Sequence, residues 1–180
     1  MIKFFLLFFF IIFLGNTNAN NKEKIINNLI KTENIVFEFE QNIDGKIENG
    51  SCTIQYPKKI FCKYFKNKIL VSNGKSVVIK TLSGYYRYPL EKTPFNILLD
   101  KNFLIKKIDI LNERVLEDSH ISYTISENDN KIEIFFDNIT FDLIGWQIKD
   151  IYQNLNITLI SSIEKNKILN KNLFKLPLQN

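Results

Sequence analysis

The chain has 180 residues, 45% of them hydrophobic, and carries a formal net charge of +5, two cysteines and one histidine. This length suits one domain with a sizeable core. The lysines are scattered instead of forming a basic stripe interleaved with aromatic residues, which argues against a nucleic-acid groove. Two cysteines and one distant histidine do not favour a metal site. We therefore expect no nucleic-acid partner, no metal and no other cofactor.

The first 19 residues have the three parts of a secretory signal peptide. Lys3 supplies the positive charge, residues 4–14 form an apolar run, and Thr17-Asn18-Ala19 offers a small-residue cleavage site. The apolar run is too short to span a membrane, which takes about 20 residues. No cysteine that could accept a lipid follows the cleavage site. We expect a soluble mature domain, residues 20–180.

The mature chain opens with an amphipathic helix and continues with strands. The helix is predicted over residues 22–32, where four apolar residues form one stripe: Ile25, Ile26, Leu29 and Ile30. Alternation of apolar and polar residues predicts strands at 34–42, 47–56, 60–66, 68–73 and 76–81. Asp44-Gly45 and Asn73-Gly74 are typical hairpin turns. Residues 85–90 are rich in tyrosine, but Pro89 would confine a strand there to a sheet edge.

The second half of the chain mixes helix and strand. Thr93 offers an N-cap hydroxyl with Pro94 at the first helical position, and residues 94–107 look helical with a break near Asp100. Further strands are predicted at 119–126, 131–137, 139–149 and 153–163, and a last helical turn is predicted before Phe174. Antiparallel strands interrupted by a few helices predict a single α+β domain with the helices on one side of the sheet.

The second and third strands place both cysteines on one face. Their period of two gives an apolar face made of Cys52, Ile54, Tyr56, Ile60, Cys62 and Tyr64. A turn at residues 57–59 would pair Ile54 with Cys62 and leave Cys52 on the diagonal, ~7 to 8 Å away and beyond disulfide reach. A bulge or a longer loop would bring the cysteines together. A Cys52–Cys62 disulfide is therefore an open alternative.

The ordered set of segments resembles the LolA family, periplasmic carriers that escort lipoproteins from the inner to the outer bacterial membrane. The likeness is carried by residues 37–41, 50–64, 70–75, 93–99, 143–150 and 156–160, together with the closing Phe174-Lys175-Leu176-Pro177. It covers about residues 22–178. The resemblance implies an incomplete, unclosed antiparallel β-barrel whose helices form a lid over an apolar cavity.

Such a cavity has an energetic purpose. A lipoprotein acyl chain has on the order of 15 methylenes, and at ~0.8 kcal/mol each its exposure to water costs on the order of 12 kcal/mol. A curled sheet can shield it with the apolar side chains of its inner face. The candidates for this lining are Ile35, Phe37, Phe39, Cys52, Ile54, Tyr56, Ile60, Cys62, Tyr64, Phe95 and Leu98. Each of them could equally be an ordinary core residue.

One position departs from the family. The residue before Pro57 is usually an arginine that ties the lid to the sheet through several hydrogen bonds, and this chain has Tyr56. Tyrosine has one hydroxyl, whereas arginine has five N–H donors. We expect the lid to be held less firmly, or by other residues.

The resemblance implies a monomeric periplasmic chaperone that delivers acylated outer-membrane lipoproteins. It would receive them from an inner-membrane ABC lipoprotein-release complex and pass them to an outer-membrane lipoprotein acceptor. The alternatives are a lipid- or lipoprotein-sensing regulatory domain of the same fold, as in envelope-stress regulators, and a transporter or enzyme for small apolar ligands. We do not expect an enzyme, because His120 neighbours Ser119 and Asp118 on one strand, where adjacent side chains point to opposite faces.

Overall fold

The computed structural model describes residues 20–116, 120–127, 130–149 and 154–179. The predicted signal peptide lies outside these residues, as do Asp118 and Ser119.

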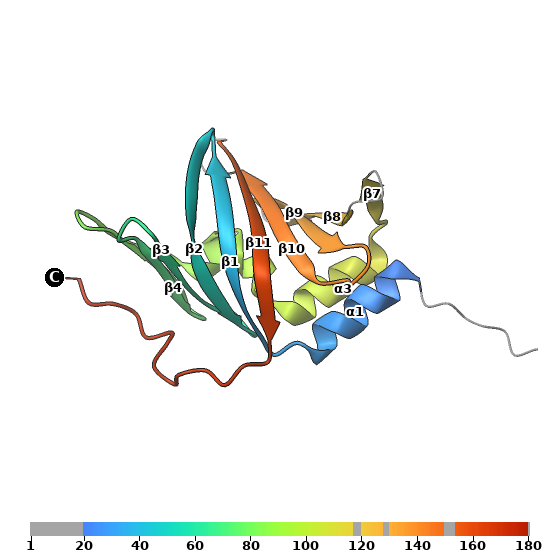
Figure 1. The fold of residues 1–180 in the computed structure, drawn as a ribbon, viewed down its shortest axis with the longest axis horizontal. Helices are drawn as coiled ribbons and strands as arrows, with labels where there is room; N and C mark the ends of the chain where they lie inside the picture. The colour runs from blue at the N-terminus through green and yellow to red at the C-terminus, as the bar shows by residue number, and fades with distance from the viewer. Residues whose placement is uncertain (1–19, 117–119, 128–129, 150–153, 180) are drawn as a thin grey trace, which may run out of the picture.

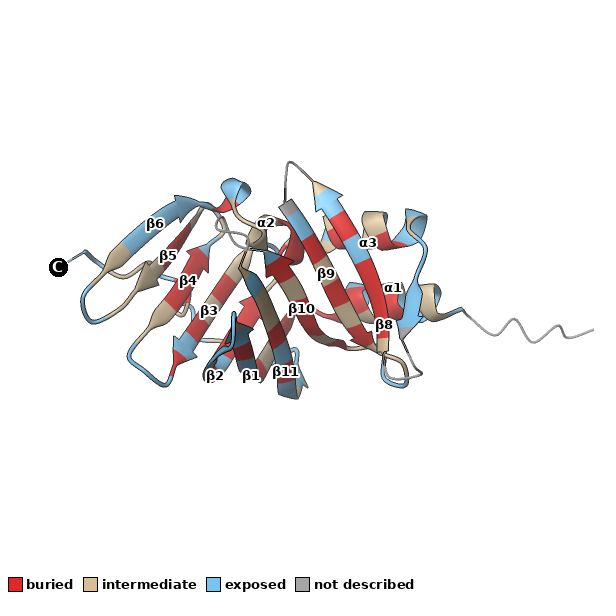
Figure 2. Cartoon of the chain, turned by 90° about the horizontal axis from the view of Figure 1, so that it is seen from above, coloured by how far each residue is buried: buried red, intermediate tan, exposed pale blue. Residues whose placement is uncertain are grey.

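Within the described residues, eleven strands form one antiparallel sheet: β1 (Asn34–Ile43), β2 (Lys46–Gln55), β3 (Lys59–Tyr64), β4 (Ile69–Asn73), β5 (Ser76–Lys80), β6 (Tyr85–Pro89), β7 (Arg114–Leu116), β8 (His120–Glu127), β9 (Asn130–Asp137), β10 (Leu143–Lys149) and β11 (Leu155–Lys165). Their order is β6-β5-β4-β3-β2-β1-β11-β10-β9-β8-β7. The sheet curls strongly, as Figures 1 and 2 show, but β6 and β7 remain as two separate edges. The prediction of an unclosed antiparallel barrel is therefore confirmed.

The helices cover the concave face of one half of this sheet. They are α1 (Asn21–Lys31), the 3-10 turn η1 (Leu90–Lys92), α2 (Phe95–Leu98) and α3 (Lys101–Ile110). In Figures 1 and 2, α1 and α3 lie side by side next to β8 to β10. The helical region breaks at Asp100, as predicted, because its carboxylate accepts a hydrogen bond of 3.1 Å from the Phe103 amide and caps α3.

Local turn chemistry explains most of the element boundaries. Asp44 and Gly45 have φ values of 50° and 86°, and Gly74 has 95°, so both predicted hairpin turns are confirmed. Pro89 ends β6 at the edge of the sheet. The predicted Thr93 cap is wrong, because its hydroxyl donates to the Leu90 carbonyl at 2.8 Å and closes η1 instead. The segment before Phe174 forms turns without a helix.

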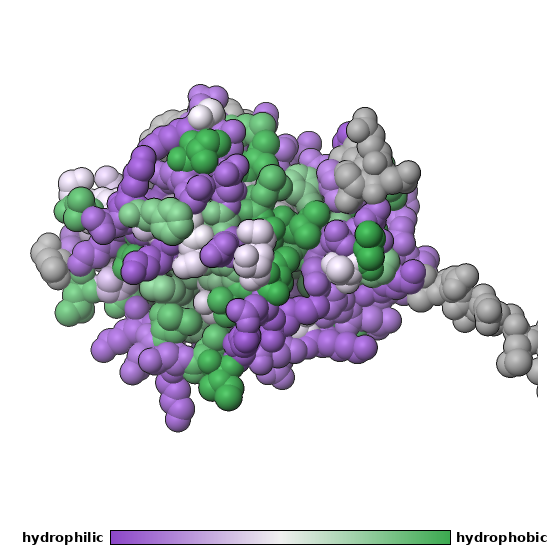
Figure 3. Space-filling view, viewed as in Figure 1, coloured by the Kyte–Doolittle hydropathy of each residue, from purple (hydrophilic) through white to green (hydrophobic). Residues whose placement is uncertain are grey.

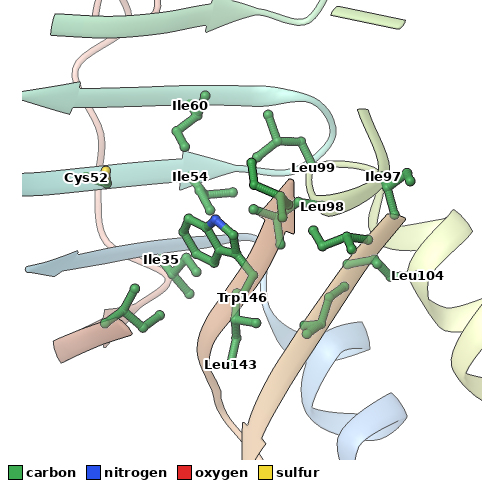
Figure 4. Packing of buried hydrophobic residues seen from close by; sticks show 14 of the residues in the cluster. Ile35, Cys52, Ile54, Ile60, Ile97, Leu98, Leu99, Leu104, Leu143 and Trp146 are labelled. Carbon is green, nitrogen blue, oxygen red and sulfur yellow. The ribbon is translucent and has the colours of Figure 1, made fainter. Parts of the chain in front are cut away.

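The core lies on the concave face and joins both halves of the sheet. Figure 2 shows buried and exposed positions alternating along the strands, as expected where one face is covered. In Figure 4, Trp146 of β10 points toward Ile35 and Ile54, with Leu98 and Leu99 of the α2 region nearby. Strands far apart in the sequence are thus connected through one apolar interior.

The C-terminal segment, residues 166–179, lies over the opposite, convex face of β3 to β6. Val71 and Val78 point to this face, yet both are fully buried and neither belongs to the main core. The buried ring of Phe174 lies 5.9 Å from the Lys59 ammonium. Lys80 and the Tyr85 hydroxyl donate to the Leu178 and Pro177 carbonyls at 3.1 and 3.3 Å. The segment therefore acts as a strap across the outer surface.

Candidate functional site

The predicted lining residues come together in the structure. Nine of them are buried in the core cluster: Ile35, Phe37, Phe39, Cys52, Ile54, Ile60, Cys62, Tyr64 and Leu98. Tyr56 and Phe95 are partly buried and pack against the same cluster. These residues lie on one side of the interior, and their role as a lipid lining stays a prediction. The sequence analysis missed the strands beyond β1, which contribute Tyr123, Ile134, Phe136, Trp146 and, directly beside Phe39, Ile160.

Aromatic side chains bridge neighbouring and distant strands of this inner face. Phe37 meets Trp146 edge to face with ring centroids 6.3 Å apart, and Phe39 meets Tyr64 at 4.9 Å. Phe39 also fills the space above Gly50, where an added Cβ would lie 2.9 Å from its ring and 2.2 Å from the Lys63 carbonyl oxygen. Gly50 is needed there because the Phe39 ring approaches the β2 backbone closely.

The two cysteines form a disulfide in the middle of the inner face. The pairing expected from a turn at residues 57–59 is wrong: Gln55 pairs with Lys59, so the turn spans residues 56–58 and Lys58 takes a positive φ of 67°. This one-residue displacement puts Cys52 directly opposite Cys62, with Cα atoms 4.1 Å apart. Direct opposition brings the sulfur atoms within bonding reach without a bulge.

A buried polar layer borders the apolar interior toward the turn that joins β1 to β2. The Tyr64 hydroxyl donates to Gln41 Oε1 at 3.2 Å, and Gln41 Nε2 donates to Asn156 Oδ1 and Thr158 Oγ1 at 3.0 and 3.2 Å. Burial, reinforced by the negative charge of Glu48, raises the pKa of Tyr64, so this hydroxyl remains a donor. The sequence analysis missed this layer, although Gln41 continues the inward alternation of Phe37 and Phe39.

We call α2 and α3, the helices over the inner face, the lid, and lysines and backbone groups hold it in place. The Lys58 amide donates to the Leu99 carbonyl at 2.8 Å, and the Lys58 ammonium lies 3.3 Å from the Asp100 carboxylate. Lys101 donates to the Thr32 and Ile30 carbonyls at 2.9 and 3.3 Å, which ties α3 to the end of α1. Tyr56 takes part through its ring, 5.8 Å from the Lys101 ammonium. Lysine contacts thus connect the lid to the sheet and to α1.

A small pocket lies beside the lid. It measures about 20 Å³ and borders Ile35 and Tyr56 between α1 and the sheet. Pockets that hold drug-sized ligands usually measure about 300 to 1,000 Å³. This pocket is therefore too small for a long acyl chain.

His120, the histidine that the sequence analysis considered, lies at the start of β8. The His120 ring meets Phe135 edge to face at 5.2 Å. Among the residues that the structure describes, no three His, Cys, Asp or Glu side chains come close enough to hold a metal ion. In the same part of the chain, no helix combines the length and the apolar character needed to cross a membrane.

Comparisons with known proteins agree with this architecture. The family model described as outer membrane lipoprotein carrier protein LolA matches residues 31–177. A comparison with curated proteins finds no matching sequence. Among solved structures, an uncharacterized conserved protein from Thermus thermophilus has a TM-score of 0.50 at 8% identity, over 88% of this chain and 95% of that one.

Two further solved structures are similar over most of their length. A LolA superfamily protein from Nitrosomonas europaea has a TM-score of 0.47 at 7% identity, over 86% of this chain and 96% of that one. Lipoprotein LppX from Mycobacterium tuberculosis has a TM-score of 0.43 at 9% identity, over 83% and 95%.

Proposed function

This chain belongs to the LolA family of outer membrane lipoprotein carrier proteins, and we propose that it is a soluble periplasmic chaperone for lipoprotein acyl chains. It would take lipoproteins released by an inner-membrane ABC complex and deliver them to an acceptor at the outer membrane. It would act as a monomer and without chemistry of its own. The direction of lipoprotein transfer would then be set by these partners.

The apolar inner face supports this proposal most directly. Side chains from β1, β2, β3 and β10 meet those of α2 in one continuous cluster. Leu98 and Leu99 are fully buried in it and lie at the end of the short helix α2. If α2 lifted, an acyl chain could cover the apolar surface that these leucines leave. Because apolar area would be exchanged for apolar area, the exchange would cost little hydrophobic free energy.

The polar layer indicates which end of a bound lipid would lie at this border of the interior. Acyl chains that lie along Ile54 and Ile60 are shielded from water, whereas the glyceryl and amide groups of the lipid need hydrogen-bond partners. Gln41, Tyr64 and Thr158 offer such groups at one border of the interior. We infer that the polar end of the lipid faces this layer.

The chain carries its own reporter for acyl binding. Trp146 is its one tryptophan and is only 3% exposed within the core cluster. A triacylated peptide with brominated acyl chains should quench Trp146 fluorescence, because heavy-atom quenching needs near contact, and the unbrominated peptide should not. Absence of quenching under conditions where the peptide binds would contradict acyl binding at this face.

Matched substitutions on β1 test the same face. Phe39→Asp places a carboxylate among apolar groups and should abolish binding of the triacylated peptide, whereas Glu38→Asp keeps an exposed carboxylate and should be near neutral. Circular dichroism separates lost affinity from misfolding. Equal affinity of folded Phe39→Asp and the unchanged protein would refute the lining. Peptide binding without transfer between membranes would favour the sensing alternative.

A further inference from the structure

Three hairpin turns lie at the same end of the sheet. Strands β1 to β6 follow one another in space as they do in sequence, so every second turn falls at the same end. These are the turns between β1 and β2, between β3 and β4, and between β5 and β6. We call the residues at this end, 44–48, 63–68 and 80–84, the hairpin-tip surface.

Large apolar side chains project from this surface. Phe65 is 81% exposed and Leu82 is 85% exposed, each in a turn where polar residues are usual, and Ile47 is exposed nearby. The Phe65 amide donates to the Asn49 carbonyl at 3.1 Å, which fixes its backbone beside β2. Ile47, Phe65 and Lys66 border one surface pocket. In Figure 3, green apolar atoms interrupt the hydrophilic surface near the end of β1 and β2 and farther left.

The same surface is basic. Its three segments contain five lysines, Lys46, Lys63, Lys66, Lys68 and Lys80, but only two acidic residues, Asp44 and Glu48. Lys46 lies 3.4 Å from Glu48, and Lys68 also pairs with this carboxylate. Lys63 and Lys66 are exposed beside Phe65. Lysines that appear scattered along the sequence are thus gathered by the fold around protruding apolar groups.

We propose that the hairpin-tip surface docks on an anionic phospholipid membrane. Phe65 and Leu82 enter the boundary between headgroups and acyl chains, and the lysines face the headgroup phosphates. Apolar anchors surrounded by basic residues are the combination that binds anionic lipid surfaces. Lys80 donates to the Leu178 carbonyl, so the charge available on this surface comes from the other two turns. The charge pattern favours a lipid surface because phosphates spread over a plane can meet Lys46, Lys63 and Lys66 at once while Leu82 inserts from the third turn.

Vesicle flotation of the exported, full-length mature protein tests this proposal. We expect binding to vesicles of 70% phosphatidylcholine and 30% phosphatidylglycerol, much weaker binding to phosphatidylcholine alone, and a decrease with added salt. Phe65→Ser combined with Leu82→Ser should weaken binding to the anionic vesicles by about tenfold or more, since each side chain loses apolar burial. Both residues are exposed, so the variant should fold normally.

Two controls make the result decisive. Ile139→Ser removes an apolar group that is also 79% exposed, but in the turn after β9 at the opposite end of the sheet, and should leave vesicle binding unchanged. Quenching of Trp146 by the brominated peptide should persist in the double variant, which separates docking from acyl binding. No binding to anionic vesicles at low salt, or equal binding by the double variant, would overturn the proposal. Capture by an acidic protein in place of vesicles would overturn it as well.

Discussion

Cys52 and Cys62 cross-link two adjacent strands in the centre of the inner face. The bond closes a short loop, since the cysteines are 10 residues apart. Exchanging both for alanine should lower the free energy of unfolding by about 3 kcal/mol, because the unfolded chain regains the entropy that the cross-link removes. Urea titrations with and without a reducing agent measure the difference. The unchanged protein should lose similar stability on reduction, and the double variant should not respond.

Thiol titration tests directly whether the two cysteines are bonded. If thiol titration of the denatured protein, without reductant, found two free cysteines, the strands would be held by packing alone. The sequence could place both cysteines on one face but could not determine the register, because the position of the turn differs by a single residue between the expected and the observed pairing. Three-residue loops that begin at Tyr56 or at Pro57 look alike in the sequence.

At the scale of elements, lysine side chains fasten α3 to α1 at both ends: Lys22 of α1 donates to the Asp109 carbonyl of α3 at 2.8 Å, and Lys101 of α3 contacts the end of α1. Lys101 donates to two carbonyls at the end of α1, where the helix dipole favours a cation. Lys101→Met keeps the aliphatic stem but removes these bonds, at a cost of about 1 kcal/mol. We expect this variant to take up and release the triacylated peptide faster than the unchanged protein does. Stopped-flow fluorescence of Trp146 measures both rates.

Tyr56→Phe is the matched control for this variant. It removes only a hydroxyl, and even a well-formed hydrogen bond to such a group contributes about 1 kcal/mol. The ring near Lys101 remains. Its release rate should therefore stay close to that of the unchanged protein. Should Tyr56→Phe accelerate release as much as Lys101→Met does, the latch would depend on the hydroxyl instead of the lysine.

Most elements were predictable because their periodicity is strong. The alternation of β1 and β2 and the stripe of α1 are each explained by one covered face. The three-residue strand β7 was missed because so short a segment shows no period. The polar layer was missed because Gln41 gains its partners, Tyr64 and Thr158, only through strand pairing. The order of the strands in the sheet likewise decides which apolar strand faces meet across the interior, and this order cannot be read from periodicity.

At the scale of the whole molecule, the sheet is covered on both faces but by different means. The inner face is closed by helices, and part of the outer face by the C-terminal strap. The strap meets the helices only near its start, among the contacts of the described residues, where Asn166 donates to the Lys31 carbonyl of α1 at 3.0 Å. Phe174 and the Leu178 carbonyl contact Lys59 and Lys80 on the outer face instead. We therefore expect the strap to stabilise the fold without controlling access to the inner face.

Phe174→Ala tests this separation. The ring is buried over a face where Val71 and Val78 are also buried, so its loss should lower the free energy of unfolding by about 2 to 3 kcal/mol. For a domain of this size, that corresponds to a fall in Tm of very roughly 5 to 10 °C. Lys175→Ala, at an exposed neighbouring position, should leave Tm unchanged. Quenching of Trp146 by the brominated peptide should be the same in both variants at a temperature where both are folded. Stronger quenching in folded Phe174→Ala would show that the strap and the interior are coupled, and the two faces would then have to be treated as one unit.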